Sequence, residues 1–243
     1  MQIADLEIAR EFWGQVSVQI PENEYDDLDK RLKYKSDQVR SLLIESDPLA
    51  LSFNDINFLL RSSFASRRKA KEILGSLDLD DLREGLADLV QSSSSIEQRT
   101  YTLRKHLERF PSAQMELPFE LLHNLYPDRY WPWSKWIWNP DSNTGALRLL
   151  VSEECELFGR DDFETYELVC AASDFLFHTL AAAGLGVDIA SPFSFDIFVA
   201  GVYATYMSTV LEMRMTKEFN QIVPSAVELA ARLLGIYKLK VGL

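Results

Sequence analysis

Apolar residues recur along most of the chain at intervals of three, four and seven positions, the spacing that places them on one face of an α-helix. One such run, within residues 22–45, consists of Tyr25, Leu28, Leu32, Val39, Leu42 and Leu43. Similar patterns predict helices over residues 3–18, 53–60, 67–74, 79–90, 96–110, 163–183, 193–216 and 224–237. Stretches compatible with strands are short and lie at residues 16–20, 146–151 and 236–243. We therefore predict an all-α, multi-helix globular bundle with at most a few short strands.

Residues with preferences for helix ends support several of these boundaries. Ser52, followed three residues later by Asp55, resembles a capping box at the start of a helix. Ser66 and Asp78 can cap the next two helices, and Gly75 can end the first of them.

One polar stretch separates two helical patterns. Residues 91–98 read QSSSSIEQ, and four consecutive serines are typical of a linker. We therefore predict an N-terminal helical subdomain over residues 1–91, a linker over 92–98 and a C-terminal helical domain over 99–243.

Composition indicates a folded, globular protein and excludes some functions. The chain has 243 residues, of which 47% are hydrophobic and 26% charged. Its formal net charge of −12 excludes a protein that binds nucleic acid over its whole surface, because phosphate contacts need clustered Lys and Arg. Cys155 and Cys170 cannot form a disulfide framework, which favours the reducing cytoplasm. The first twenty residues lack a signal-peptide pattern, and Asp196 interrupts the most apolar stretch, so we expect no membrane segment.

The segment from residue 117 to residue 140 is rich in tryptophan and proline. It contains four of the five tryptophans and four of the nine prolines, and we predict that it is irregular. Its aromatic side chains can pack the loop onto the helices, anchor a protein interface or stack on nucleobases. The candidate interface or stacking residues are Tyr130, Trp131, Trp133, Trp136 and Trp138.

Within this segment, LLHNLYPDRYWPWSK resembles a sequence of the helix-hairpin-helix DNA glycosylases and their non-catalytic relatives. The matching residues are Leu121, Leu122, His123, Leu125, Pro127, Tyr130 and Pro132. The resemblance covers about fifteen of the 243 residues. The glycine hairpin of the family is missing, and Ser134 lies where the resemblance would place the catalytic acid. A relationship would thus imply a member of the family without glycosylase activity.

Two segments carry local positive charge. Residues 61–71 (RSSFASRRKAK) contain five cations and no acid, and residues 99–109 contain a second group. Such side chains can bind phosphates, with hydroxyls of Ser62, Ser63 and Ser66 as additional donors. They can equally form a solvated face that pairs with acidic surfaces. The candidate phosphate or nucleic-acid ligands are Arg61, Arg67, Arg68, Lys69, Lys71, Arg104 and Lys105.

Candidates for catalysis and metal binding are few. Residues 153–167 contain seven carboxylates without EF-hand spacing or a nearby histidine, which favours a charged loop and helix start. The three histidines lack a partner at metal-ligand spacing, so we predict neither a metal nor a cofactor. Asp174 and His178 lie four positions apart on an apolar helix and are weak catalytic candidates; a satisfied buried pair is the alternative.

These observations favour a cytoplasmic, non-catalytic accessory or adaptor protein that binds other macromolecules in a larger assembly. We expect a protein partner, and nucleic acid is a further candidate partner through the basic segments. The alternative is a nucleic-acid-processing or nucleotide-handling enzyme that stacks a base on the Trp-rich segment. Self-assembly through an apolar helix also remains open.

Overall fold

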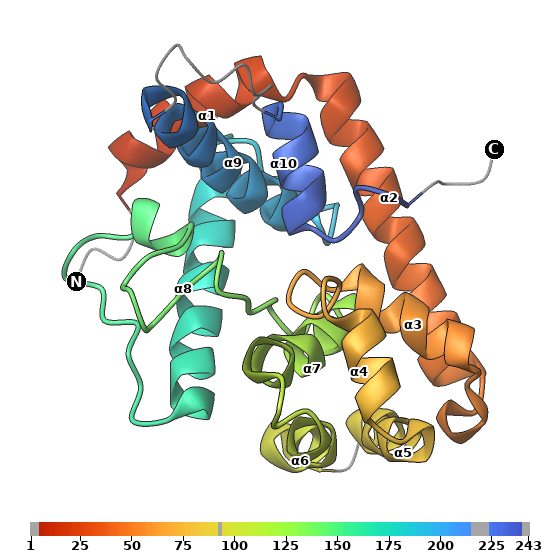
Figure 1. Ribbon diagram of the computed structural model, residues 1–243. Coiled ribbons are helices and arrows are strands. Elements are labelled where there is room, and N and C mark those ends of the chain that lie inside the picture. The colour runs from red at the N-terminus through yellow and green to blue at the C-terminus, as the bar shows by residue number, and fades with distance from the viewer. Residues whose placement is uncertain (1–4, 92–93, 215–223, 240–243) are drawn as a thin grey trace. The chain divides into compact units, whose positions relative to one another are not determined.

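The computed structural model describes residues 5–91, 94–214 and 224–239, with the side chains of 212–214 excepted (Figure 1). These residues form ten α-helices and no β-strand, apart from an isolated antiparallel bridge between Asn139 and Thr144. The all-α prediction is therefore confirmed. The helices are α1 (Leu6–Gln19), α2 (Glu22–Arg40), α3 (Phe53–Ser62), α4 (Ala70–Ser76), α5 (Leu79–Val90), α6 (Ile96–His106), α7 (Pro111–Leu125), α8 (Asp162–Ala182), α9 (Ser194–Arg214) and α10 (Ala226–Leu233).

The chain divides into two compact units, and the division falls within α2. Unit 1 comprises Met1–Leu32 and Lys135–Leu243, and unit 2 comprises Lys33–Ser134. The polar stretch at 92–98 therefore lies inside unit 2 and not between the units, although its residues 92 and 93 are outside the described residues. The reason is that α5, which ends just before this stretch, packs closely against α6, which begins within it at Ile96.

Capping side chains act largely as their sequence positions suggest. Ser52 and Asp55 form the expected capping box at the start of α3, and Asp78 caps α5. Ser66 is different: its buried hydroxyl donates to the carbonyl oxygen of Leu60, and α4 begins only at Ala70. Gly75 is consequently inside α4 and does not end it.

The Trp- and Pro-rich segment is only partly irregular. Its first residues belong to α7, which contains Pro118 in its interior, so the prediction of an irregular chain was wrong for residues 117–125. Residues 126–140 form turns and extended chain without a regular helix. The predicted strand at 16–20 lies mostly in α1, and residues 147–149 form a 3₁₀ turn.

Unit 2 is built around α7, whose last ten residues are all buried. Leucine side chains from several helices, among them Leu59, Leu86, Leu103 and Leu121, form one continuous core. The close packing of α5 on α6 depends on Gly85, because a Cβ atom at that position would lie 2.7 Å from the Cα of Leu103.

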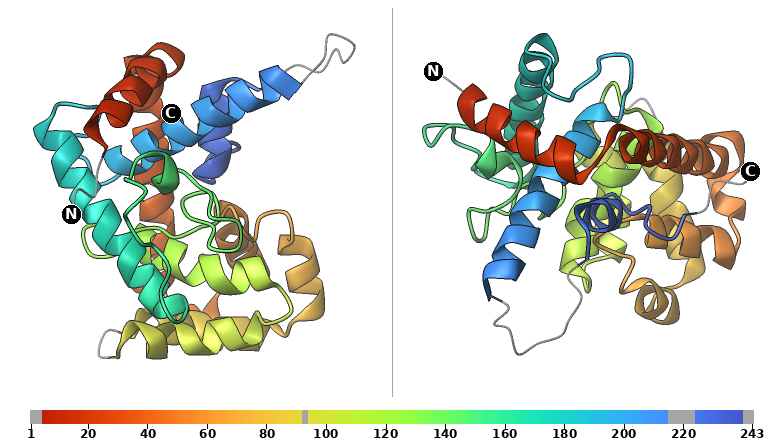
Figure 2. Two further views of the ribbon diagram at one scale, coloured as in Figure 1. Left: turned by 90° about the vertical axis from the view of Figure 1, so that its left-hand side faces the viewer. Right: turned by 90° about the horizontal axis from the view of Figure 1, so that it is seen from above.

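In unit 1, α9 packs against α1 and α10 (Figure 2). The rings of Trp13 and Phe198 meet at 6.2 Å between centroids, and Gly201 allows the close approach of Val16. By length and composition, residues Ser194–Leu211 of α9 could cross a membrane, but 67% of this stretch is buried inside the protein. A largely buried apolar stretch of this kind is typical of a helix in the core of a folded protein.

Within unit 1, Tyr25 of α2 forms hydrogen bonds to the backbone of the loop between α8 and α9 and of the start of α9. Its hydroxyl lies 2.8 Å from the carbonyl oxygen of Gly186 and 2.6 Å from that of Ser194, to which it donates. Burial raises the pKa of Tyr25 far above its ordinary value, and the negative charges of Asp196 and Asp29 act in the same direction. The phenol therefore remains a protonated donor.

Candidate functional site

The first basic segment, residues 61–71, presents most of its cations to solvent. Lys69 forms an exposed ion pair with Glu72 at 2.6 Å, and the guanidinium of Arg67 lies 4.7 Å from the ring centroid of Phe64. Residues 64–69 form turns, so Arg67, Arg68 and Lys69 lie outside a helix, although the sequence pattern predicted a helix over residues 67–74. Four of the five cationic side chains are exposed, namely Arg61, Arg68, Lys69 and Lys71.

The three serines of this segment do not complete a phosphate site. Ser62 and Ser66 are buried and donate to backbone carbonyl oxygens, and the hydroxyl of Ser63 donates to Glu120 at 2.6 Å. Their hydroxyls thus stabilise the turn and are not directed to solvent. Any anion at this surface would meet the cationic side chains alone.

The second basic segment divides between buried and exposed positions. Lys105 is exposed, whereas Arg104 is half-buried and its Nη2 donates to the sulfur of Met115. Arg99 is 2% exposed and donates to the carbonyl oxygen of Leu89 and to the hydroxyl of Tyr130. Arg99 therefore has a structural role in holding α5, α6 and the residues after α7 together.

The aromatic residues of the Trp-rich segment in unit 2 pack against its core. Trp133 is 4% exposed, and its ring centroid lies 5.6 Å from that of Phe119 in α7. Tyr130 and Trp131 are half-buried. His123 is buried beside the same segment, with its Nδ1 2.6 Å from the carbonyl oxygen of Tyr130.

The two tryptophans of this segment in unit 1 are buried as well. Trp136 is 6% exposed and Trp138 is 1% exposed. The Trp136 ring lies near that of Tyr203 in α9, and Trp138 meets Phe158 edge to face with centroids 5.1 Å apart. Burial of this degree favours packing over base stacking among the three interpretations of the segment.

Asp174 and His178, the weak catalytic candidates, lie together on the surface of α8. Their side chains are 61% and 62% exposed, and the nearest oxygen and nitrogen are 3.8 Å apart. The pair is thus not the buried pair that was the alternative reading. An exposed contact at this distance orients an imidazole weakly.

Within the acidic segment, residues 153–162, exposed and buried side chains alternate from Glu154 to Phe158. Cys155 and Leu157 are buried, whereas Glu154, Glu156 and Phe158 are exposed. Burial raises the pKa of the Cys155 thiol, and the positive charge of nearby Arg148 opposes this effect. Its buried residues anchor the segment, and the stretch from Glu154 to Phe158 presents two carboxylates and an aromatic ring to solvent.

This segment ends at a firmly capped helix. Asp161 accepts hydrogen bonds from the backbone N–H groups of Phe163 and Glu164 at the start of α8. The N–H of Gly159 donates to the hydroxyl of Thr165. An exposed hydrogen bond from Arg160 lowers the pKa of Glu164. The acids at 161–164 therefore have helix-capping roles, as expected for a charged loop that leads into a helix.

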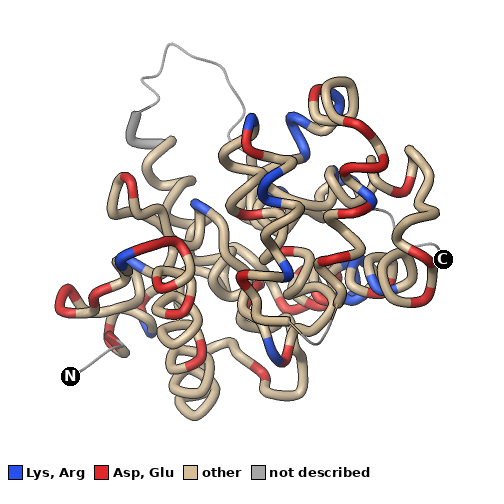
Figure 3. Tube along the Cα trace, turned by 90° about the horizontal axis from the view of Figure 1, so that it is seen from below, with Lys and Arg blue, Asp and Glu red and all other residues tan. Residues whose placement is uncertain are grey.

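Charge is distributed unevenly between the units, and Figure 3 marks the charged positions along the chain. Unit 1 has eleven Lys and Arg residues against twenty-two Asp and Glu residues, which gives a net charge of −11. Unit 2 has fourteen against fifteen, which gives −1. Nearly all of the chain's net negative charge thus belongs to unit 1.

The sequence did not reveal a polar connection between α2 and α7 in unit 2. The ammonium group of Lys35 lies 3.0 Å from Oε1 of Glu120, and both residues are buried. Ser63 and the backbone N–H of Phe64 donate to the other carboxylate oxygen. Because the lysine and the glutamate are 85 residues apart, no local spacing pattern could identify this pair.

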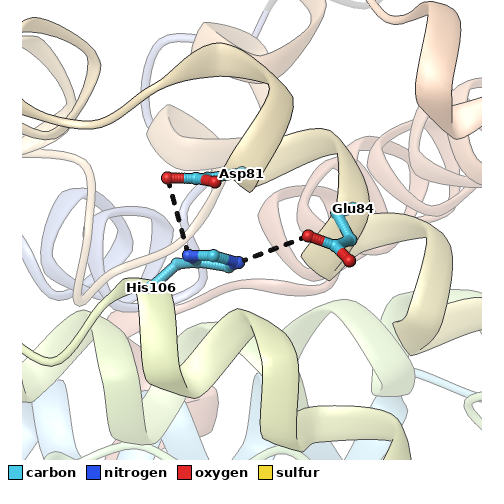
Figure 4. Close-up of side chains that lie close together, drawn as sticks. All are labelled: Asp81, Glu84 and His106. Atoms are coloured by element: carbon cyan, nitrogen blue, oxygen red, sulfur yellow. Dashed lines mark ion pairs between the residues drawn. The ribbon is translucent and has the colours of Figure 1, made fainter.

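A second group missed by sequence analysis consists of Asp81, Glu84 and His106 (Figure 4). Asp81 and Glu84 lie one turn apart on α5, and His106 is the last residue of α6. Helix pairing joins these residues across more than twenty positions, whereas the sequence prediction considered histidine partners only at i+3 and i+4. The only local sign of the group in the sequence was that Asp81 and Glu84 are three positions apart, which places both carboxylates on one side of a helix.

Comparisons with known proteins give no relationship: no family model, curated protein or solved structure matches the chain. The resemblance of residues 121–135 to helix-hairpin-helix glycosylases therefore stays a prediction.

Proposed function

We propose that the chain is a non-catalytic accessory protein that binds another macromolecule within a larger assembly, and that its main partner is a basic protein surface. The observation that carries this proposal is the concentration of charge, −11, in unit 1. An acidic surface attracts a basic partner, orients it during encounter and disfavours acidic competitors.

The acidic segment is the part of unit 1 that best suits this contact. Glu154, Glu156 and Phe158 are exposed at alternate positions, so they can face one partner together. Aromatic side chains are frequent anchors of interfaces, and Phe158 is 51% exposed despite its contact with Trp138. Carboxylates beside an aromatic anchor can supply specificity and speed of association.

Contact with nucleic acid, where the assembly contains one, is assigned to the exposed cations of residues 61–71. Arg61, Arg68, Lys69 and Lys71 offer local positive charge on unit 2, whose net charge with these residues included is −1. Such contacts position a protein on phosphates without reading sequence, and they weaken steeply with salt.

The alternative, an enzyme that stacks a base on the Trp-rich segment, has less support. Trp133, Trp136 and Trp138 are at most 6% exposed, so a base would have to displace core contacts. The catalytic candidates Asp174 and His178 are an exposed pair whose nearest oxygen and nitrogen are 3.8 Å apart, a contact that orients the imidazole weakly. We therefore prefer binding to catalysis.

Affinity capture from an extract of the source cells tests the proposal, with and without nuclease. The test variant combines Glu154→Gln, Glu156→Gln and Phe158→Ser. The control combines Glu7→Gln and Glu11→Gln, which remove the same two charges from exposed positions of α1 in unit 1. We expect a protein that resists nuclease, is retained by the control and is lost from the test variant.

Two results would contradict this proposal. If the test variant captures the same protein as the wild type, the acidic segment is not the contact. If all captured material disappears with nuclease and with Arg68→Gln and Lys71→Gln, the chain binds nucleic acid as its main partner.

A further inference from the structure

We infer that Asp81, Glu84 and His106 form a binding site for one divalent transition-metal ion of the Zn²⁺ class. Each residue offers one ligand atom, and the three atoms lie within 4.8 Å of one another. One imidazole nitrogen and two carboxylate oxygens make a donor set that Zn²⁺ accepts in proteins. Three protein ligands leave a coordination position for water.

The separations within the group fit a metal better than direct hydrogen bonds. Nδ1 of His106 is 3.7 Å from a carboxylate oxygen of Asp81, and Nε2, the other ring nitrogen, is 3.8 Å from one of Glu84, so the two carboxylates lie beside different edges of the imidazole. Both distances exceed the range of a hydrogen bond. Ligand atoms around a tetrahedral Zn²⁺ lie roughly 3.3 Å apart, given metal–ligand bonds near 2.0–2.1 Å. A single ion binds one ring nitrogen, so the carboxylate beside the other nitrogen has to rotate towards it. The three ligand atoms, one from each residue, start within 4.8 Å of one another.

The backbone that carries the ligands is held by close helix packing. Gly85 brings α5 and α6 together at Leu103, because its missing Cβ would lie 2.7 Å from the Leu103 Cα. Asp81 lies one turn before Gly85, and His106 lies three residues after Leu103, so antiparallel packing at this contact places them opposite each other. On the other side of the contact, Thr102 donates to Asp88 and Arg99 to the carbonyl of Leu89.

Exposure and charge also suit a cation. The side chain of His106 is 19% exposed, whereas those of Asp81 and Glu84 are 49% and 65% exposed, so an ion can enter from solvent. Two carboxylates brought close together repel each other, and a divalent ion between them relieves this repulsion. Imidazole is a ligand of Zn²⁺ and related metals, and oxygen donors alone suit Mg²⁺ and Ca²⁺, so we expect selectivity for the former.

Bound metal would connect the start of α5 to the end of α6. Because the ion binds the folded pair of helices and not the separated residues, it should raise the unfolding temperature of the chain. This inference is independent of the proposed protein partner, which is assigned to unit 1.

Calorimetric titration of the metal-free, full-length chain with ZnCl₂ tests the site. We expect one Zn²⁺ per chain and a higher unfolding temperature with the metal. The variants His106→Gln and Asp81→Asn should each bind at least about tenfold more weakly, since even the loss of a supporting residue costs a metal site 10–100-fold. A shift of the His106 ring resonances on addition of Zn²⁺ provides a second readout.

The matched control combines Asp174→Asn and His178→Gln. This surface pair has the same 3.8 Å separation but no third ligand, so its loss should leave Zn²⁺ binding unchanged. Asp81→Asn is the second test because its exposed side chain can be changed with little risk to folding. The inference is overturned if the wild type binds no Zn²⁺, if both ligand variants bind as tightly as the wild type, or if Mg²⁺ binds as tightly as Zn²⁺.

Discussion

The buried ion pair between Lys35 and Glu120 gives a quantitative prediction for unit 2. The ammonium and the carboxylate are 3.0 Å apart, with side chains 3% and 12% exposed. Removing either charge takes away an ion-pair partner that offsets the burial of the other. We therefore expect Lys35→Met and Glu120→Gln each to lower the free energy of unfolding by about 3 kcal/mol, the lower end of the range for a broken buried pair. The lower end applies to Lys35→Met because Ser63 and the backbone N–H of Phe64 still donate to the remaining Glu120 carboxylate.

A double variant that combines Lys35→Met with Glu120→Gln distinguishes the energy of the ion pair from that of the other contacts of the two residues. It contains neither charge, and the glutamine oxygen still accepts the hydrogen bonds of Ser63 and Phe64. We expect the double variant to lose about 3 kcal/mol and not the roughly 6 kcal/mol of two independent changes, which is a coupling energy of about 3 kcal/mol. Lys33→Met, at an exposed position of the same helix, should change stability by less than about 0.5 kcal/mol.

Urea unfolding, followed by circular dichroism, measures these differences. A loss of about 3 kcal/mol should lower the midpoint by roughly 1–3 M urea, given ordinary slopes of about 1–3 kcal/mol/M. Strictly additive single variants would refute the reasoning, because they would show no energetic coupling between the two charges. A Lys35→Met variant as stable as Lys33→Met would refute it too.

Three further predictions concern other parts of the chain. Gly85→Ala should lower the free energy of unfolding in urea by about 1–3 kcal/mol, because the added methyl group overpacks the contact with Leu103. Gly75→Ala should raise it by about 0.5–1 kcal/mol, because nothing lies within 4 Å of the added Cβ and alanine favours the helix. Equal effects of the two changes would contradict the packing argument. The raised pKa of Tyr25 means that above the ordinary tyrosine pKa of ~10 the unfolded chain releases a proton that the folded chain keeps. Stability should therefore fall with rising pH, by up to about 1.4 kcal/mol per unit, and Tyr25→Phe should reduce this slope in denaturation measured across alkaline pH; an unchanged slope would contradict the assignment. Burial raises the pKa of the Cys155 thiol, so this thiol should react slowly with Ellman's reagent. We expect the Cys170→Ser variant, which keeps only Cys155, to react more slowly than the Cys155→Ser variant, which keeps only Cys170. Unfolding both variants in urea should abolish the difference in rate.

Helical periodicity was sufficient for the fold class because apolar residues recur at helical spacing and several helix caps are local. Ser52 with Asp55, and Asp78, lie at the helix starts that the sequence predicted. Pro118 was misleading because proline normally ends or kinks a helix, whereas α7 continues through it inside a fully packed core. Ser66 was misleading for a related reason, since a long turn and not a helix follows it.

The arrangement of functional groups depended on contacts that no local pattern encodes. Unit 1 contains segments from both ends of the chain, so its boundaries follow packing and not the serine-rich stretch. The Asp81, Glu84 and His106 group exists because α5 and α6 are antiparallel neighbours. Trp136 and Trp138 are buried by partners such as Tyr203 and Phe158 that lie far along the sequence.

The most direct test of the account asks where a protein partner lies on the chain. A photo-crosslinking phenylalanine analogue at position 158 would report contacts of the acidic segment, and the same analogue at Ile189, which is 66% exposed in unit 1, serves as control. The account predicts a crosslinked protein from position 158 and none from position 189. Absence of a crosslink at 158, or equal crosslinking at both positions, would contradict the assignment of the acidic segment as the binding surface.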